Sequence, residues 1–288
     1  MEFLFQKYMD VTPKKTYPTV TQGFGIVGIL ILGMIVFSPI IFLGDQIGKS
    51  LSVLIYYLFS IGLPLGLVFN IRRKTTGIEH FNFKPFTPII VPLVVIATIA
   101  IALGVSIPIV SLIPTPEFVK QAFLMMSDDR GVYTFITLVI AAPILEELIF
   151  RGIILDGFLE IYSPVRSIIL SSILFGLVHL NPWQFLSALF IGIFMGWIYY
   201  RTNSLWLTII IHASLNLFSF LTTVITNTTP ADMDKSAVES YGGMTNFIII
   251  IISSWVVIIV SVNYLNRYFH RQDSVIAYVQ NDATLLDE

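Results

Sequence analysis

The chain of 288 residues has no cysteine and few charged side chains. The missing thiols exclude disulfide bonds, a cysteine nucleophile and thiolate metal sites. Charged residues make up 12% of the sequence, whereas a soluble domain typically carries about 25%. The net charge of −2 lacks the basic excess that nucleic-acid binding requires, so no nucleic-acid partner is expected.

Hydrophobic residues make up 56% of the sequence, and apolar runs extend from one end of the chain to the other. This composition predicts an all-α, polytopic membrane protein surrounded by lipid, because about 20 apolar residues form a helix that crosses a bilayer. Eight segments qualify as spans: approximately 23–43, 50–70, 87–113, 132–153, 165–180, 183–200, 204–225 and 244–266. Pro182, between the fifth and sixth, is typical of a sharp turn between helices or of the first turn of the next helix.

The basic residues predict the orientation of these spans, because cytoplasmic loops are enriched in Lys and Arg. With the N-terminus inside, all but four of the 16 Lys and Arg residues lie on the inner side. Both termini are therefore expected to be cytoplasmic. The expected organisation is an N-terminal tail (1–22), a transmembrane domain (23–266, with its motifs in 132–225) and a polar C-terminal tail (267–288), with 114–131 as an external loop.

Two adjacent carboxylates, Glu146 and Glu147, interrupt the fourth span. An ionised side chain is costly at membrane depth and needs a partner or a function. Arg151 follows Glu147 by four residues, so the two share a helix face and are predicted to pair. Glu146 is rotated by about 100° from Glu147, so it is expected to point into the bundle. The alternative is a cluster of snorkelling side chains at the cytoplasmic end of the span.

Two later pairs of residues, each four apart, add polar groups to apolar spans: Phe175 with His179, and His212 with Asn216. Taken singly, a histidine near a helix end is typical of an interfacial residue, and His212 with Asn216 is typical of a hydrogen-bonded pair between helices. Together with Glu146 they supply a base, a proton shuttle and oxyanion donors, which are the groups that peptide hydrolysis needs. Counted from the inner ends of the spans, the site is expected in the cytoplasmic half.

Three motifs here resemble those of the CPBP (CAAX protease and bacteriocin-processing) family of intramembrane proteases, which includes the type II CAAX prenyl endopeptidases. The first motif of the family is a pair of glutamates, then three residues and an arginine. The second is a phenylalanine, then three residues and a histidine. The third is a histidine, then three residues and an asparagine. They occur in the same order in this chain, at Glu146-Glu147-Leu148-Ile149-Phe150-Arg151, at Phe175 to His179 and at His212 to Asn216.

The resemblance implies a role for each motif residue. Glu146 and His179 would activate water, and His212 and Asn216 would stabilise the oxyanion. The supporting residues would be Glu147, Arg151 and Phe175. The chain has no His-Glu-x-x-His sequence, the usual zinc signature, so no obligatory metal cofactor is expected. The alternative is a zinc ion held by Glu146, His179 and His212.

The expected function is that of an endopeptidase in the cell membrane with its active site toward the cytoplasm. The resemblance implies a membrane-associated substrate: a lipid-modified (CAAX-like) protein or a peptide precursor. One alternative is a catalytically silent scaffold or immunity protein of the same fold. Another is a small transporter with a carboxylate–histidine proton relay, although the chain lacks the pair of repeated, interrupted helices that many transporters have.

Overall fold

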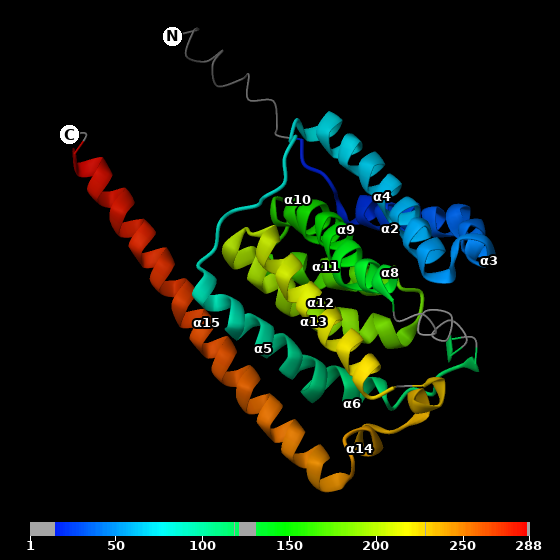
Figure 1. Ribbon diagram of the computed structural model, residues 1–288. Coiled ribbons are helices and arrows are strands. Elements are labelled where there is room, and N and C mark those ends of the chain that lie inside the picture. Colours follow the sequence, from blue (N-terminus) through cyan, green and yellow to red (C-terminus); the bar gives the residue numbers. More distant parts are fainter. Residues whose placement is uncertain (1–14, 118, 121–130, 228, 287–288) are drawn as a thin grey trace.

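The computed structural model describes residues 15–117, 119, 120, 131–227 and 229–286 (Figure 1). Within these ranges the regular structure is helical, apart from an isolated antiparallel bridge between Phe83 and Ser204. The all-α prediction is therefore confirmed. Residues 1–14 of the predicted N-terminal tail, most of the external loop and the last two residues lie outside the described ranges.

Six helical segments of the described chain are long and apolar enough to cross a membrane, as expected of an integral, multi-pass membrane protein. They are Val20–Ile47 (α2 Val20–Phe37, η1 Ser38–Leu43, α3 Gly44–Ile47), Lys49–Thr76 (α4), Pro88–Val110 (η2 Pro88–Ile90, α5 Val91–Ile101, η3 Ala102–Ser106, α6 Ile107–Val110), Pro182–Thr202 (α12), Leu205–Ile225 (α13) and Met244–Gln272 within α15 (Met244–Leu286). The count of eight spans and the orientation of the termini stay predictions.

The fourth predicted span is helical from 132 to 159, but π-helical turns interrupt it twice. Its segments are α8 (Val132–Phe135), η4 (Ile136–Ala141), α9 (Ala142–Ile149), η5 (Phe150–Leu155) and α10 (Asp156–Leu159). Pro143 in the first turn of α9 has no N–H to donate to the preceding turn, which explains the wider hydrogen bonding just before it. The helix also ends six residues later than predicted.

The fifth predicted span forms a shorter helix, α11 (Pro164–Leu177). His179 therefore lies in the turn after the helix and not inside it. Leu180 adopts a left-handed conformation, with φ of 57°. The Asn181 side chain then caps α12 by accepting a hydrogen bond from the backbone N–H of Gln184 at 2.8 Å, and Pro182 occupies the first turn. The predicted sharp turn is confirmed.

A buried polar cluster joins α4, α10 and α12 at one end of the bundle. Arg72 forms an ion pair with Asp156 at 2.6 Å. The same carboxylate accepts hydrogen bonds from Asn82 at 2.8 Å and from the Tyr199 hydroxyl at 2.9 Å. We call this the basic end, because Lys84, Arg166 and Arg201 also lie at helix ends or in a connection here.

The opposite end of the bundle carries the turn between α11 and α12. There the Trp183 indole N–H donates to the Ile113 carbonyl at 3.1 Å, and the Thr115 hydroxyl donates to the Met233 carbonyl at 3.2 Å. These bonds attach two connections, the one after α6 and the one after α13, to each other and to the first turn of α12.

The final helix, α15, extends past the other helices and continues to Leu286 (Figure 1). The polar segment 267–286, predicted as a tail that follows the last span, is therefore part of the same helix. The ring of Phe269 is buried and contacts Trp197, and Arg201 lies over it with 5.4 Å between the guanidinium carbon and the ring centre. These contacts hold the beginning of this segment against α12.

Replacement of Arg72 by alanine should destabilise the bundle. Arg72 is 2% exposed, and its loss leaves the carboxylate of Asp156 without a counter-ion. Breaking such a buried pair costs about 3–5 kcal/mol. Thermal unfolding in detergent should therefore show a clear decrease in melting temperature. The matched control is Arg73→Ala, because Arg73 is exposed and its loss should change stability little; equal losses for the two variants would contradict the prediction.

Candidate active site

The two adjacent glutamates of α9 have different partners. Arg151 donates to an oxygen of Glu147 at 2.8 Å, and the side chains of this pair are 1% and 0% exposed, respectively. The predicted pairing is therefore confirmed. Glu146 is only partly buried and points away from Arg151 toward α4 and α13. The rotation of about 100° between neighbouring helical residues separates the two carboxylates.

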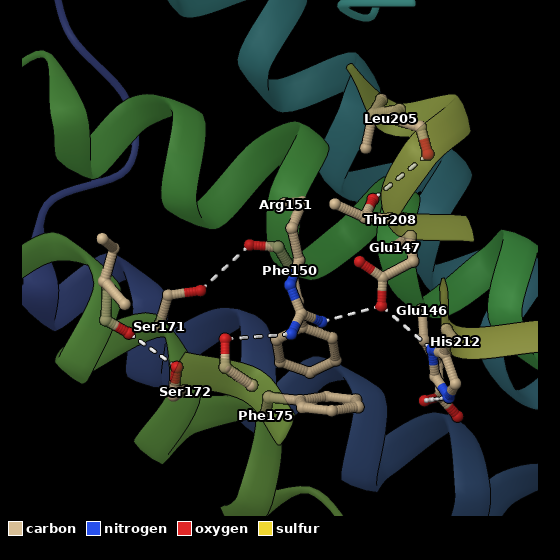
Figure 2. Close-up of polar contacts among 12 residues, drawn as sticks. Glu146, Glu147, Phe150, Arg151, Ser171, Ser172, Phe175, Leu205, Thr208 and His212 are labelled. Carbon is tan, nitrogen blue, oxygen red and sulfur yellow. Dashed lines mark hydrogen bonds and ion pairs between the residues drawn. The ribbon is translucent and has the colours of Figure 1, made fainter. Parts of the chain in front are cut away.

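Glu147 also holds His212, a contact that sequence reasoning missed. Figure 2 shows its carboxylate between the guanidinium of Arg151 and the ring of His212. The Nδ1 atom of His212 lies 2.9 Å from the oxygen that Arg151 contacts. A carboxylate only accepts hydrogen bonds, so Nδ1 carries the proton and donates. The other ring nitrogen, Nε2, is directed toward Glu146, with 3.9 Å between Nε2 and Oε2.

Phe175 connects the three motifs through its ring. The guanidinium carbon of Arg151 lies 4.6 Å from the ring centre, a cation–π contact. The centres of the His179 and His212 rings lie 5.3 Å and 5.8 Å from it, both nearly perpendicular. Arg151 also donates to the Gly192 carbonyl of α12 at 3.4 Å. The buried arginine and phenylalanine thus bring α9, α11, α12 and α13 together.

Glu146 accepts one hydrogen bond from a side chain outside the three motifs. The Tyr57 hydroxyl of α4 donates to its Oε1 atom at 2.5 Å. Sequence reasoning missed Tyr57, because a tyrosine in an apolar span carries no motif and lies 89 residues before Glu146. Only the packing of α4 against α8 and α9 brings it here.

His179 and Asn216 line a pocket of about 130 Å³ together with Phe175 and His212. The Nδ1 atom of His179 lies 2.9 Å from the Phe175 carbonyl; since a carbonyl only accepts, Nδ1 donates and Nε2 is left to accept. Asn216 donates to the Leu138 carbonyl at 2.8 Å, and its amide keeps a second N–H. The remaining lining residues are Gln184, Ser187, Ala188, Ile191, Met195 and Leu215.

The structure thus brings His179, His212 and Asn216 to one pocket. Glu146 does not line this pocket, but its Oε2 atom lies 3.9 Å from the Nε2 atom of His212, which does. In the described ranges, no group of three or more His, Cys, Asp or Glu side chains is gathered in a way that could hold a metal ion. The side chains of the alternative zinc set, Glu146, His179 and His212, do not form such a group. The expectation that no obligatory metal is needed stays a prediction.

Replacement of Arg151 by alanine should destabilise the protein far more than replacement of Glu146 by glutamine. The first change leaves Glu147 buried without its counter-ion, at a cost of about 3–5 kcal/mol. The second keeps an acceptor for Tyr57 and should change stability by about 1 kcal/mol or less. Thermal unfolding of both variants in detergent measures the difference, and similar melting temperatures would show that the two carboxylates do not have separate roles.

Comparison with known proteins gives matches in the part of the chain that holds the motifs. Residues 129–218 match the family described as "Type II CAAX prenyl endopeptidase Rce1-like". The chain is 35% identical over 79 residues to "Putative membrane peptidase YdiL" of Bacillus subtilis (strain 168) and 37% identical over 80 residues to "UPF0177 protein YxdF" of Lactococcus lactis subsp. lactis (strain IL1403).

These alignments are partial. Each covers 27% of this chain, and they cover 32% and 44% of the two relatives, respectively, which is less than half of either. No solved structure matches the chain. The family match nevertheless includes all three motifs. It confirms the resemblance of this chain to the type II CAAX prenyl endopeptidases over residues 129–218.

Proposed function

We propose that this protein is an intramembrane endopeptidase that hydrolyses a peptide bond of a membrane-associated substrate. The observation that carries the proposal is the convergence of His179, His212 and Asn216 on one pocket beside Glu146. These side chains come from α9, α13 and the turn after α11. The family match supports the same reaction class.

In the proposed reaction, Glu146 and His179 activate a water molecule: Glu146 takes one of its protons, and the Nε2 atom of His179 accepts a hydrogen bond from its other O–H. Glu146 is the carboxylate suited to this role, because Glu147 is committed to Arg151 and His212. His179 offers Nε2 as an acceptor, since its Nδ1 proton is held by the Phe175 carbonyl. The water oxygen then attacks the carbonyl carbon of the scissile bond, and the proton passes to the departing amine.

The negative charge on the tetrahedral intermediate would be stabilised by His212 and the second N–H of Asn216. His212 can donate from Nε2 while Nδ1 remains bonded to Glu147 only when the ring is doubly protonated. In this proposal Glu147 orients His212 by accepting the hydrogen bond from Nδ1, and Arg151 in turn holds Glu147.

The proposed substrates are membrane-associated proteins or peptide precursors, including lipid-modified proteins of the CAAX kind. The pocket is lined in part by apolar side chains, among them Ile191, Met195 and Leu215, which suits a segment that enters from the bilayer.

The second candidate function, a silent scaffold or immunity protein, keeps the same fold and predicts that the catalytic side chains are dispensable.

Replacement of Glu146 by glutamine should reduce cleavage by about a hundredfold or more, because it removes the general base. The measurement compares the N-termini of membrane and secreted proteins in cells that make the wild type, Glu146→Gln or the surface control Glu160→Gln. Cleavage products of the enzyme should be lost only in Glu146→Gln. Unchanged biological function in a Glu146→Ala/His212→Ala variant that still captures a stable partner would favour the scaffold.

The pocket extends along α12 from Gln184 to Met195 and reaches the end of the bundle opposite the basic end. Its lining residues His179 and Gln184 flank the α11–α12 turn. Because the helix that carries Glu146 continues to 159, Glu146 is ten residues, or about 15 Å, from Asp156 in the polar cluster of the basic end. If the basic end is cytoplasmic, as the charge count predicts, the pocket faces the other side. We therefore propose a non-cytoplasmic opening in place of the expected cytoplasmic one.

Single cysteines should reveal this topology directly, because the chain has none of its own. In intact cells, a thiol reagent that does not cross membranes should label Gln184→Cys at the start of α12. It should label Lys74→Cys, at the end of α4, only after the membrane is opened. The reverse pattern would place the pocket on the cytoplasmic side.

A further inference from the structure

We infer that Tyr57 is a positioning residue of the active site, because its hydroxyl holds the carboxylate of Glu146 in the orientation that the reaction needs. The effect of Tyr57 on catalysis rests on the proposed function, whereas the hydrogen bond between Tyr57 and Glu146 does not. Tyr57 lies in α4, outside residues 129–218 and outside all three motifs.

The two oxygens of Glu146 face different groups. Oε1 accepts from Tyr57 at 2.5 Å, which is at the short end of the range for a hydroxyl bonded to a carboxylate. Oε2 faces the Nε2 atom of His212 at 3.9 Å. A carboxylate is planar, so a fixed Oε1 also restricts where Oε2 points. Tyr57 thereby directs the second oxygen toward the pocket side of Glu146.

No other side chain in the described part of the chain donates a hydrogen bond to Glu146. The nearby cation, Arg151, is bonded to Glu147 and to the Gly192 carbonyl. His212 donates to Glu147 from Nδ1, and its Nε2 atom is beyond hydrogen-bond distance of Glu146. Without the Tyr57 hydroxyl, the side chain of Glu146 would be free to rotate about its own bonds. Misplacement of a reacting group by about 1 Å can reduce a rate about a hundredfold.

The position of Tyr57 also shows how the N-terminal half of the chain contributes to the site. The helix α4 packs against α8 and α9, and it carries the tyrosine 89 residues before the glutamate that it contacts. The matched segment 129–218 therefore contains the motif residues but not the hydroxyl that orients the base. We expect full activity to require α4 in addition to this segment.

Infrared difference spectroscopy of the full-length protein tests the contact without a substrate. The carboxylate stretching band of Glu146 is identified by its loss in Glu146→Gln. In Tyr57→Phe the frequency of this band should shift, because the carboxylate loses its hydrogen bond. The matched control is Tyr56→Phe, which alters the neighbouring tyrosine of the same helix and should leave the band in place. An unshifted band in Tyr57→Phe would overturn the inference.

The effect of Tyr57 on the rate of cleavage is measured with a purified substrate. That substrate is the one identified by comparing the N-termini of cellular proteins between the wild type and Glu146→Gln. Tyr57→Phe should lower kcat about ten- to a hundredfold, the effect of losing a hydrogen bond to a charged group, while KM stays within about twofold. Unchanged kcat would overturn the positioning role. A wild-type protein that cleaves no substrate would count against the proposed function, and the band shift would still support the contact.

A second variant covers the case in which Tyr57→Phe fails to fold. Incorporation of 3-fluorotyrosine at position 57 keeps the ring and the hydroxyl and makes the hydroxyl a stronger donor. The band of Glu146 should shift in the direction opposite to that expected for loss of the bond. No shift in this variant would also overturn the inference.

Discussion

The site depends on the buried ion pair between Glu147 and Arg151. Two charges removed from both water and lipid are tolerated only when each has polar or charged partners. Arg151 has a carboxylate, a backbone carbonyl and the face of Phe175. Glu147 has Arg151 and His212, both on its Oε1 atom, whereas its buried Oε2 atom has no hydrogen-bond partner in the described part of the chain. Because these partners come from separate helices, the electrostatic requirement also fixes the positions of those helices around the pocket.

The backbone of the fourth span adds a second constraint. The eight residues of α9 lie between two π-helical stretches, and Pro143 explains the first of them. A π turn changes the direction in which the following side chains point, and such turns are common at functional sites. Here the segment directs Glu147 into the protein, and it directs Glu146 toward Tyr57 and His212.

The two ends of the bundle differ in their chemistry. At the basic end, the Asp156 carboxylate joins Arg72, Asn82 and Tyr199, so that three helix ends and a connecting loop are attached through one partly buried carboxylate. At the other end, side chains bond to backbone carbonyls between connections, as Trp183 does to Ile113. An ion-paired network thus closes one end of the bundle, whereas the pocket reaches the turn between α11 and α12 at the other end.

The sequence by itself determined the features that depend on local spacing and composition. The hydrophobic composition and the apolar runs predicted an all-α membrane protein. Four-residue spacing predicted the pairing of Glu147 with Arg151, because neighbours on one helix face are set by the helix period. The three motifs predicted the resemblance to the type II CAAX prenyl endopeptidases, which the family match confirms over residues 129–218. Only the tertiary structure decided the contacts between helices: Glu147 with His212, Tyr57 with Glu146, and the position of the pocket relative to the basic end. These depend on how distant helices pack, and on helix ends such as Leu177 and Leu159, which hydropathy places only to within a few residues.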